Sequence, residues 1–453
     1  MIRAQLSMDG LYQVARDSFE YIQDQRRSTS ITFSLADSLI AGLSVFTFKC
    51  ESLLKFEDLG LDENLGRNLR ALLKMTKIPS DTQLRDILDP VNPEELRPAF
   101  DGVLRAMQRG NELKEFMFRG YYPIGLDGTG YYSSSNIMCD CCLVKKSKSK
   151  EADDGEDSNE LIYHHQMLGA AIVHPYLKQV IPLFPEPIKN EDGQKKNDCE
   201  RNASKRWVEK FRSHHPKMPV IILEDSLASN VPHLEILKKF DCRYLTGVKE
   251  GDHRYLFEQF MINSKTSCTS QHMTAENKGE KVIKTITKEY EFINGLELNR
   301  ANSEFKTNLI VFKEKILNKK TGSIEEKKFS WVTDLDITES NVADIVILAR
   351  RRWGIENEVF KTLKDVTAYN IEHNYGHGSK NLAVNFALLA FLAFLIDQVL
   401  EATCSIVKEI LSVVKKKSLW PLMKIGLEFV EVNSWNEFLE LIHRRKVKKL
   451  NTG

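Results

Sequence analysis

The sequence predicts a mixed α/β fold, and three patterns predict it. Residues 1–115 place apolar side chains at helical spacing, which predicts an all-α N-terminal domain. Residues 116–262 and 334–400 alternate short apolar runs with helical stretches, as an α/β core does. Residues 263–333 contain short β-branched runs separated by turns and are expected to form a β-rich insertion in that core. Residues 401–453 return to helical spacing and are expected to form a helical C-terminal region with a basic tail.

The N-terminal domain shows the boundaries of short helices. Leu35 and Leu39 recur at helical spacing, and Ser80 is the expected N-cap of a helix that ends at Asp89. Asn92 precedes a proline that begins the next helix. Short helices joined by such turns are typical of DNA-binding modules and equally typical of other helical domains, so both interpretations stay open.

The core is predicted to begin with a three-strand meander and to continue with strand–helix units. The expected strands lie near residues 122–128, 137–144, 161–173, 219–224 and 242–248. The expected helices lie near residues 198–213, 231–240, 252–261 and 338–365. In the insertion, the clearest strands are expected at residues 282–287, 309–312 and 329–333, with turns at Asn294-Gly295 and 318–322.

The most apolar run, residues 386–396, predicts a buried helix rather than a membrane span. Its eleven residues fall short of the roughly 20 that cross a bilayer, and Asn385 and Asp397 close its ends. No N-terminal segment has the pattern of a signal peptide, and the eight cysteines show no disulfide-like spacing. A location in a reducing cytoplasm, with no membrane partner, is therefore expected.

Composition sets the broad class of the protein but not its partner. The chain has 453 residues, of which 42% are hydrophobic and 28% charged, as in ordinary globular proteins of several domains. The formal net charge of +1 gives no sign of a nucleic-acid partner. An acidic site can offset basic patches, however, so local charge decides more than the sum.

The sequence does not decide whether a cluster of cysteines binds a metal. Cys139 and Cys142 have the spacing of a zinc knuckle, and His164 and His165 are candidates to complete it. No second cysteine pair follows, and Cys141 interrupts the usual pattern.

Three acids occupy positions from which a magnesium site can form. Asp127 ends an apolar strand, Asp225 follows a second apolar strand, and Glu356 lies on the helix predicted at residues 338–365. Acids delivered by two strand ends and a helix can converge, and such hard oxygen ligands favour two Mg²⁺ ions, or Mn²⁺ in their place, over Zn²⁺. Pairs of this kind hydrolyse phosphodiesters.

Each acid also has an ordinary explanation. Taken singly, Asp127 could be the residue that opens a turn, Asp225 could be the cap of the following helix, and Glu356 could be a surface charge. Glu224 and Glu358 lie within two residues of the chosen acids and are rival ligands.

Three motifs carry a resemblance to a known family. They are Leu126-Asp127-Gly128-Thr129-Gly130-Tyr131, Glu224-Asp225-Ser226-Leu227-Ala228-Ser229-Asn230 and Arg352-Trp353-Gly354-Ile355-Glu356-Asn357-Glu358. With these motifs in order, the chain resembles the DDE transposases of bacterial insertion sequences, from about Leu69 to Gln398. The resembled group carries a β-strand insertion inside an RNase H-like catalytic core.

The resemblance implies a cut-and-paste enzyme that binds the terminal inverted repeats of its own element. Asp127, Asp225 and Glu356 would be its catalytic and metal-binding residues, with two Mg²⁺ ions as cofactor. The implied partners are double-stranded DNA, at the element ends and the target, and a second copy of the chain on the paired ends. The helix at residues 382–400 or the C-terminal helices would supply the dimer interface. The implied location is the bacterial cytoplasm, in association with the nucleoid.

The resemblance also implies DNA contacts on the helix of Glu356. Arg352 would hold a phosphate beside the metals, and Arg351, Lys361 and Lys364 are further candidates; Arg350 and Arg351 contact phosphates or face solvent. The family's lysine stands seven residues after the glutamate, where this chain has Leu363. On an α-helix, Lys364 would lie about 80° around from Glu356. The family's tyrosine, three residues before the arginine, is replaced by Ala349.

Two other functions remain open on the sequence. An RNase H-like nuclease or resolvase would cut DNA without joining it. A domesticated DNA-binding protein would bind DNA without catalysis.

Overall fold

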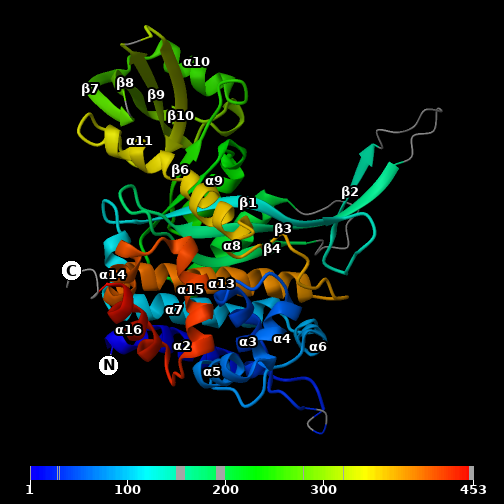
Figure 1. The fold of residues 1–453 in the computed structure, drawn as a ribbon. Coiled ribbons are helices and arrows are strands. Elements are labelled where there is room, and N and C mark those ends of the chain that lie inside the picture. The colour runs from blue at the N-terminus through cyan, green and yellow to red at the C-terminus, as the bar shows by residue number, and fades with distance from the viewer. Residues whose placement is uncertain are drawn as a thin grey trace, which may run out of the picture.

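The computed structural model describes residues 2–27, 29, 31–148, 159–189, 199–278, 280–319 and 321–447. Within these ranges, ten strands form one sheet, and helices pack against it (Figure 1). The mixed α/β class expected from the sequence is therefore confirmed.

The sheet runs through the core and the insertion without a break. Its strand order is β2-β3-β1-β5-β6-β10-β9-β8-β7, with β4 paired to β3 beside this path. The strands β1 and β5 are parallel, as are β5 and β6, whereas the other neighbours are antiparallel. The core strands are β1 (Tyr122–Ser134), β2 (Leu143–Lys148), β3 (Asn159–Ile172), β4 (Ile181–Ile188), β5 (Val220–Glu224) and β6 (Arg243–Gly247).

Two core strands differ from the expectation. The strand expected near residues 137–144 begins only at Leu143, because residues 139–142 form a turn in which the Cys142 N–H donates to the Cys139 carbonyl. Strand β4 was not predicted, since its three prolines argue against a strand. It pairs only with β3 among the described strands, and an edge position tolerates residues that cannot donate to a ladder.

The insertion extends the sheet beyond β6. It contains β7 (Thr266–Lys278), β8 (Glu280–Glu297), β9 (Lys306–Asn318) and β10 (Ile324–Thr333). The turn expected at Asn294-Gly295 is wrong: β8 continues through it, and the pairing register shifts between Ile293 and Leu296 while Gly295 has φ +79°. Some bulges and the tight hairpin turns both place a residue at positive φ, so a glycine fits either. The turn expected at residues 318–322 is confirmed, with Gly322 at φ +70°.

Helices of the core follow their expected positions closely. They are α8 (Glu200–His214), α9 (Val231–Lys239) and α10 (Arg254–Ile262). The helix expected at residues 338–365 is not one continuous α-helix. It divides into α11 (Val342–Arg350), a π-helical segment η6 (Ile355–Phe360) and α12 (Lys361–Lys364).

The N-terminal helices form a layer below the sheet in Figure 1. They are α1 (Ile2–Gln5), α2 (Met8–Glu20), α3 (Leu35–Thr47), α4 (Leu53–Leu61), α5 (Glu63–Leu73), α6 (Asp81–Leu88) and α7 (Arg97–Arg109), with short 3-10 turns at Pro93–Leu96 and Leu113–Phe116. The cap expected at Ser80 is present as a reciprocal capping box with Gln83.

The C-terminal helices pack on this N-terminal layer. They are α14 (Ser405–Val413), α15 (Lys416–Phe429) and α16 (Trp435–Lys446). The buried Asn68 amide donates to the carbonyls of Leu427 and Val430, each at 2.7 Å. The Asp9 carboxylate accepts from the Trp435 N–H at 3.0 Å. The two ends of the described chain therefore share one helical body.

Helix α13 (Leu382–Thr403) joins this helical body to the sheet. It packs against β4 on one side and α3 on the other (Figure 1). Among the described residues it is the one helix long and apolar enough to cross a membrane, and 94% of its most apolar window is buried inside the molecule. That burial is what a core helix of a soluble protein shows. Residues 382–400, where a dimer interface is expected, are thus covered by other parts of the same chain.

Candidate functional site

Two of the three acids stand at the same edge of the sheet. Gly125 on β1 pairs with Leu223 on the parallel neighbour β5. Asp127 and Asp225 each follow this pair by two residues, so the sheet delivers both to one edge. Asp225 also accepts the Leu227 N–H at 2.9 Å and caps a short 3-10 turn. It therefore occupies the strand end and the cap position together.

Arg352 links the first acid to the third. Its guanidinium donates to Asp127 Oδ2 at 2.9 Å and contacts Glu356 Oε1 at 2.8 Å. The arginine and Asp127 are largely shielded from solvent, with side-chain exposures of 15% and 20%. The helix that follows the insertion thus returns to the end of β1.

The charge state of Asp127 reflects this crowding. Burial and, to a smaller extent, the neighbouring Glu356 raise its pKa to about 7, although Arg352 and the Gly128 N–H act in the opposite direction. A carboxyl in this setting gains from a further positive charge, because burial and a second acid both disfavour its ionised form.

The donor set fits hard divalent cations, although the side chains are arranged around Arg352 here. All three groups are carboxylates, the ligands that Mg²⁺ prefers. Among the described residues, the one group of metal-ligating side chains whose ligand atoms already lie within 4.8 Å of one another is Cys139, Cys142, His165 and His377. In the acid site, the guanidinium of Arg352 supplies the positive charge between Asp127 and Glu356.

The carboxylates of the rival acids interact with other partners. Glu224 is buried and accepts hydrogen bonds from the Ser204 hydroxyl at 2.6 Å and from His233 Nε2 at 2.7 Å. It serves as a buried polar link between α8, β5 and α9, which explains why Asp225 rather than Glu224 faces the open edge. Glu358 lies on η6 near Arg351, whose charge it stabilises.

Glu200 is an acid of this site that sequence reasoning did not assign. It begins α8, and a Cβ placed on Gly128 would lie only 2.0 Å from its Oε1. The carboxylate therefore rests on the residue next to Asp127, and a larger residue at position 128 would require the Glu200 side chain to move. Burial raises the pKa of Glu200, and the charge of Asp225 adds to the effect. In the sequence, the glycine after Asp127 is a sign that another group approaches closely there, but no nearby residue shows that this group is Glu200.

Two cavities meet at Asp225. One, of about 400 Å³, is lined by the acids Asp127, Glu200, Glu224 and Asp225. The other, of about 460 Å³, lies between the core and the insertion and also contains Glu224 and Asp225. Its remaining charged and aromatic lining residues are Lys249, Glu250, Phe257, Lys328, Phe329, Trp331, Arg350, Arg352 and Trp353.

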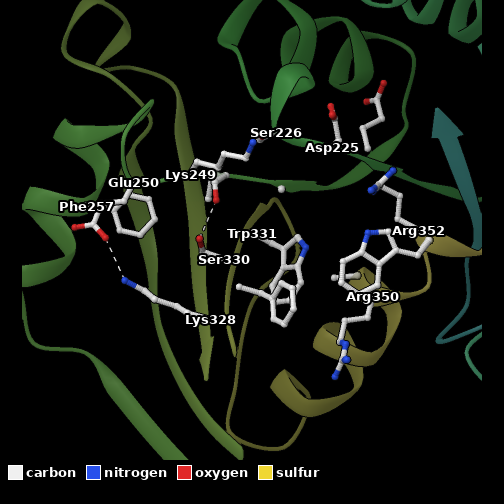
Figure 2. Close-up of a pocket in the computed structure, with 16 residues that line it drawn as sticks. Asp225, Ser226, Lys249, Glu250, Phe257, Lys328, Ser330, Trp331, Arg350 and Arg352 are labelled. Atoms are coloured by element: carbon white, nitrogen blue, oxygen red, sulfur yellow. Dashed lines mark hydrogen bonds and ion pairs between the residues drawn. The ribbon is translucent and has the colours of Figure 1, made fainter. Parts of the chain in front are cut away.

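Figure 2 shows the second cavity from its acidic end to the insertion. Asp225 and Arg352 lie at one end, and Glu250, Phe257 and Lys328 lie at the other. Lys328 pairs with Glu250 at 3.1 Å. Arg350 contacts Glu314 at 3.2 Å and lies over the Phe329 ring. The cavity thus combines cations with buried and partly buried aromatic side chains.

The other candidate DNA contacts have different surroundings. Arg351 is half-buried and donates to the Leu177 carbonyl at 2.9 Å, so its guanidinium is held inside the protein rather than facing solvent or a phosphate. Lys364 pairs with Glu372 at 2.8 Å, and Lys361 is exposed on α12. Leu363, the family's lysine position, is buried.

No protein-family model matches the chain, and no curated protein matches it. The functional interpretation therefore rests on the residues and contacts of this chain.

Proposed function

We propose that the protein is a DDE transposase with an RNase H-like core, which cuts and joins DNA at the ends of its own element. The observation that carries the proposal is the meeting of Asp127 and Glu356 on Arg352, at the sheet edge where Asp225 also ends its strand. Within the described sheet, the order β4-β3-β1-β5-β6 supports the proposed core, because antiparallel strands precede two parallel ones as in that fold.

Asp127, Asp225 and Glu356 would hold two Mg²⁺ ions in the proposed enzyme. Such ions activate the attacking oxygen and stabilise the leaving 3′ oxygen of a phosphodiester. The chain itself contributes the carboxylates and keeps Asp127 shielded from solvent. Arg352 holds Asp127 and Glu356 here, and its guanidinium would be the group to contact a DNA phosphate if cations took over the two carboxylates.

The cavity between core and insertion is the proposed path of the DNA strand. Lys249 and Arg350 supply positive charge along it, and the partly exposed Trp353 supplies aromatic surface on which an unpaired base can stack. The path leads to Asp225, where the proposed chemistry takes place. We further propose that the enzyme acts in the bacterial cytoplasm on the nucleoid, as a dimer on paired ends. With α13 buried, the C-terminal helices remain for the interface, where Ile425 and Phe429 are exposed.

The test uses a plasmid that carries the gene with its genomic flanks, incubated with the purified chain and Mg²⁺. We expect nicks at the element boundaries, and joining products when the ends are supplied with a free 3′ hydroxyl. Asp127→Ala, Asp225→Ala and Glu356→Ala should each abolish both reactions while DNA-end binding persists. Glu358→Gln is the matched control, because it removes a neighbouring acid on the same helical segment and should leave cutting intact.

The alternatives predict different products. Cutting without any joined product would replace the proposal with a nuclease or resolvase. DNA binding without cutting in the wild-type chain, under either Mg²⁺ or Mn²⁺, would replace it with a non-catalytic DNA-binding protein.

A further inference from the structure

Four side chains distant from the acid site enclose a small tetrahedral space. They are Cys139 and Cys142 from the turn between β1 and β2, His165 from β3, and His377 from the loop after α12. The two sulfur atoms are 3.8 Å apart. His165 Nε2 lies 3.4 Å from Cys139 Sγ and 3.5 Å from Cys142 Sγ, and His377 Nε2 lies 3.4 Å from Cys142 Sγ.

These separations match the edges of a zinc tetrahedron. With Zn–S near about 2.3 Å and Zn–N near about 2.05 Å, tetrahedral angles place the two sulfurs about 3.8 Å apart and each sulfur about 3.6 Å from a nitrogen. A disulfide would instead need sulfur atoms about 2.05 Å apart. We propose that Cys139, Cys142, His165 and His377 form a structural Cys₂His₂ zinc site.

The surroundings support a closed structural site. Cys142, His165 and His377 are buried, and Cys139 is half-buried. Four protein ligands leave no open position for a reacting molecule, which is the pattern of structural rather than catalytic zinc. Soft thiolates with imidazoles select zinc over magnesium, so this site is chemically separate from the carboxylates at Asp127.

The third cysteine of the cluster and the second histidine of the pair stay outside. The Cys141 thiol lies 3.5 Å from Asn381 Oδ1, a contact that ties the same turn to the loop before α13. His164 lies on the neighbouring position of β3, where side chains alternate between the two faces, so only His165 reaches the cluster. The sequence spacing alone could not choose between these two histidines, and it gave no sign of His377.

The zinc would fasten the loop that follows the helix of Glu356. His377 belongs to that loop, and Glu372 of the same loop pairs with Lys364 on α12 at 2.8 Å. The Asp140 N–H also donates to the Ser379 carbonyl at 3.2 Å. The metal therefore connects the β1–β2 turn and β3 with the segment that holds the end of this helix in place. Both thiols would bind as thiolates and release their protons on metal binding.

The experiment measures zinc in the full-length chain, purified under reducing conditions without chelator. We expect about one zinc per chain, released in step with thiol modification, and thiolate-to-cobalt charge-transfer bands after replacement with Co²⁺. Cys142→Ser and His377→Gln should lose the zinc, whereas the matched controls Cys141→Ser and His164→Gln should retain it. Chelation of the wild-type chain should lower its thermal unfolding midpoint, since removal of a ligand of the folded state destabilises it.

This readout does not depend on the proposed function. Asp127→Ala should retain a full complement of zinc even though it abolishes cutting. A wild-type chain that contains no zinc and binds none when zinc is added would overturn the inference. A Cys139–Cys142 disulfide in protein from a reducing cytoplasm would overturn it too, as would equal zinc loss in Cys141→Ser and Cys142→Ser. If Cys142→Ser does not fold, the wild-type metal content and cobalt spectrum decide.

Discussion

Arg352 determines the charge balance of the acid site at the scale of single residues. Its guanidinium contacts both Asp127 and Glu356, so it places one positive charge between the two carboxylates. A DNA phosphate would compete with both acids for this guanidinium, which contacts Asp127 through Nη1 and Glu356 through Nη2. Metal binding and release of the arginine toward DNA are therefore expected to be coupled.

We predict that Arg352→Ala strengthens the binding of Mn²⁺ to the DNA-free protein, because the carboxylates lose their internal cation. The same change should weaken binding of cut element ends and lower the salt slope of that binding by about one phosphate contact. Calorimetry with Mn²⁺ and anisotropy with labelled DNA at several salt concentrations measure the two effects. Arg351→Ala is the control, since its guanidinium is bonded to Leu177. Unchanged Mn²⁺ affinity in Arg352→Ala would contradict the coupling.

Glu200 gives a second prediction at this scale. Its carboxylate lies against Gly128, and the negative charge of Asp225 adds to the effect of burial in raising its pKa. Glu200 is therefore one of the acids that line the site. Glu200→Gln keeps the shape and should lower the cutting rate at limiting Mg²⁺ while high Mg²⁺ restores it. A purely helix-terminal role would instead lower the free energy of unfolding, by about 0.3–1 kcal/mol, and leave the Mg²⁺ dependence unchanged. Urea unfolding and a Mg²⁺ titration of cutting separate these outcomes.

The residues of the site were predictable where the signal was local. Asp127, Asp225 and Arg352 each stand in a short motif that shows the side chain's element and its neighbours. The local sequence around Glu200 and His377 does not show their partners, because these are brought to them by the packing of α8 and by the loop after α12. Such contacts join positions tens to hundreds of residues apart, and spacing in the sequence contains no record of them.

At the scale of elements, the π-helical segment η6 changes where Leu363 and Lys364 lie around the helix axis relative to Glu356. A turn closed by i→i+5 hydrogen bonds contains one residue more than an α-helical turn. Eight residues that include such a turn therefore rotate about as far around the helix axis as seven α-helical residues. Seven α-helical residues rotate to within about 20° of two full turns. Lys364 thus comes close to the angular position that Leu363 would have on a regular helix, and Leu363 turns into the core.

We predict that Lys364 takes the DNA contact that the resemblance implies for a lysine. Lys364→Ala should weaken element-end binding and reduce its salt slope by about one, as loss of one phosphate contact does. The alternative is that Lys364 only holds its ion-pair partner Glu372. Glu372→Gln tests this, because it should reproduce the whole effect of Lys364→Ala if the pair alone matters. Anisotropy against salt concentration for both variants provides the answer.

Elements were predictable when their pattern was regular and were missed where another force overrode it. Strand β4 carries three prolines yet forms because it lies at an edge and all of its residues are buried. The Asn294-Gly295 pair predicts a turn, but the ladder of β8 with β9 continues on both sides and absorbs the glycine as a bulge. The apolar spacing of residues 338–365 predicts one continuous α-helix. That spacing does not distinguish an α-helix from one that contains a π-helical turn with one extra residue.

At the scale of the whole molecule, a buried ion pair joins the helical body to the core. Lys49, just after α3, pairs with Asp397 on α13 at 2.7 Å, and both side chains are nearly inaccessible to solvent. The Tyr369 hydroxyl, from the segment after α12, also donates to Asp397. The sequence shows Asp397 only as a polar end to an apolar run, because its partner stands 348 residues earlier.

We predict that Asp397→Asn destabilises the protein by about 1–1.5 kcal/mol at pH 7, because Lys49 loses its partner. With a pKa of about 8, the amine can give up its buried charge at pH 7 at a cost of about 1.4 kcal/mol, which limits the loss. Urea unfolding measures this loss. Lys49→Met combined with Asp397→Asn should recover most of it, since a buried pair replaced by packed neutral groups is often near neutral in stability. A double variant as unstable as Asp397→Asn alone would show that packing, rather than the unpaired charge, causes the loss.

The unfolding free energy lost in Asp397→Asn should also depend on pH, and the titration of Lys49 determines whether it grows or shrinks as the pH rises. Burial lowers the pKa of Lys49 to about 8 in the folded protein, from an unfolded value of 10.5. The unfolded chain therefore binds more protons than the folded one between these values, and the contribution of this group to stability rises with pH across that window. Without Asp397, which raises the Lys49 pKa, the amine loses its proton still more easily. The difference in unfolding free energy between wild type and Asp397→Asn should thus shrink from pH 7 to pH 10, and a difference that stays constant would contradict a buried charge as its cause.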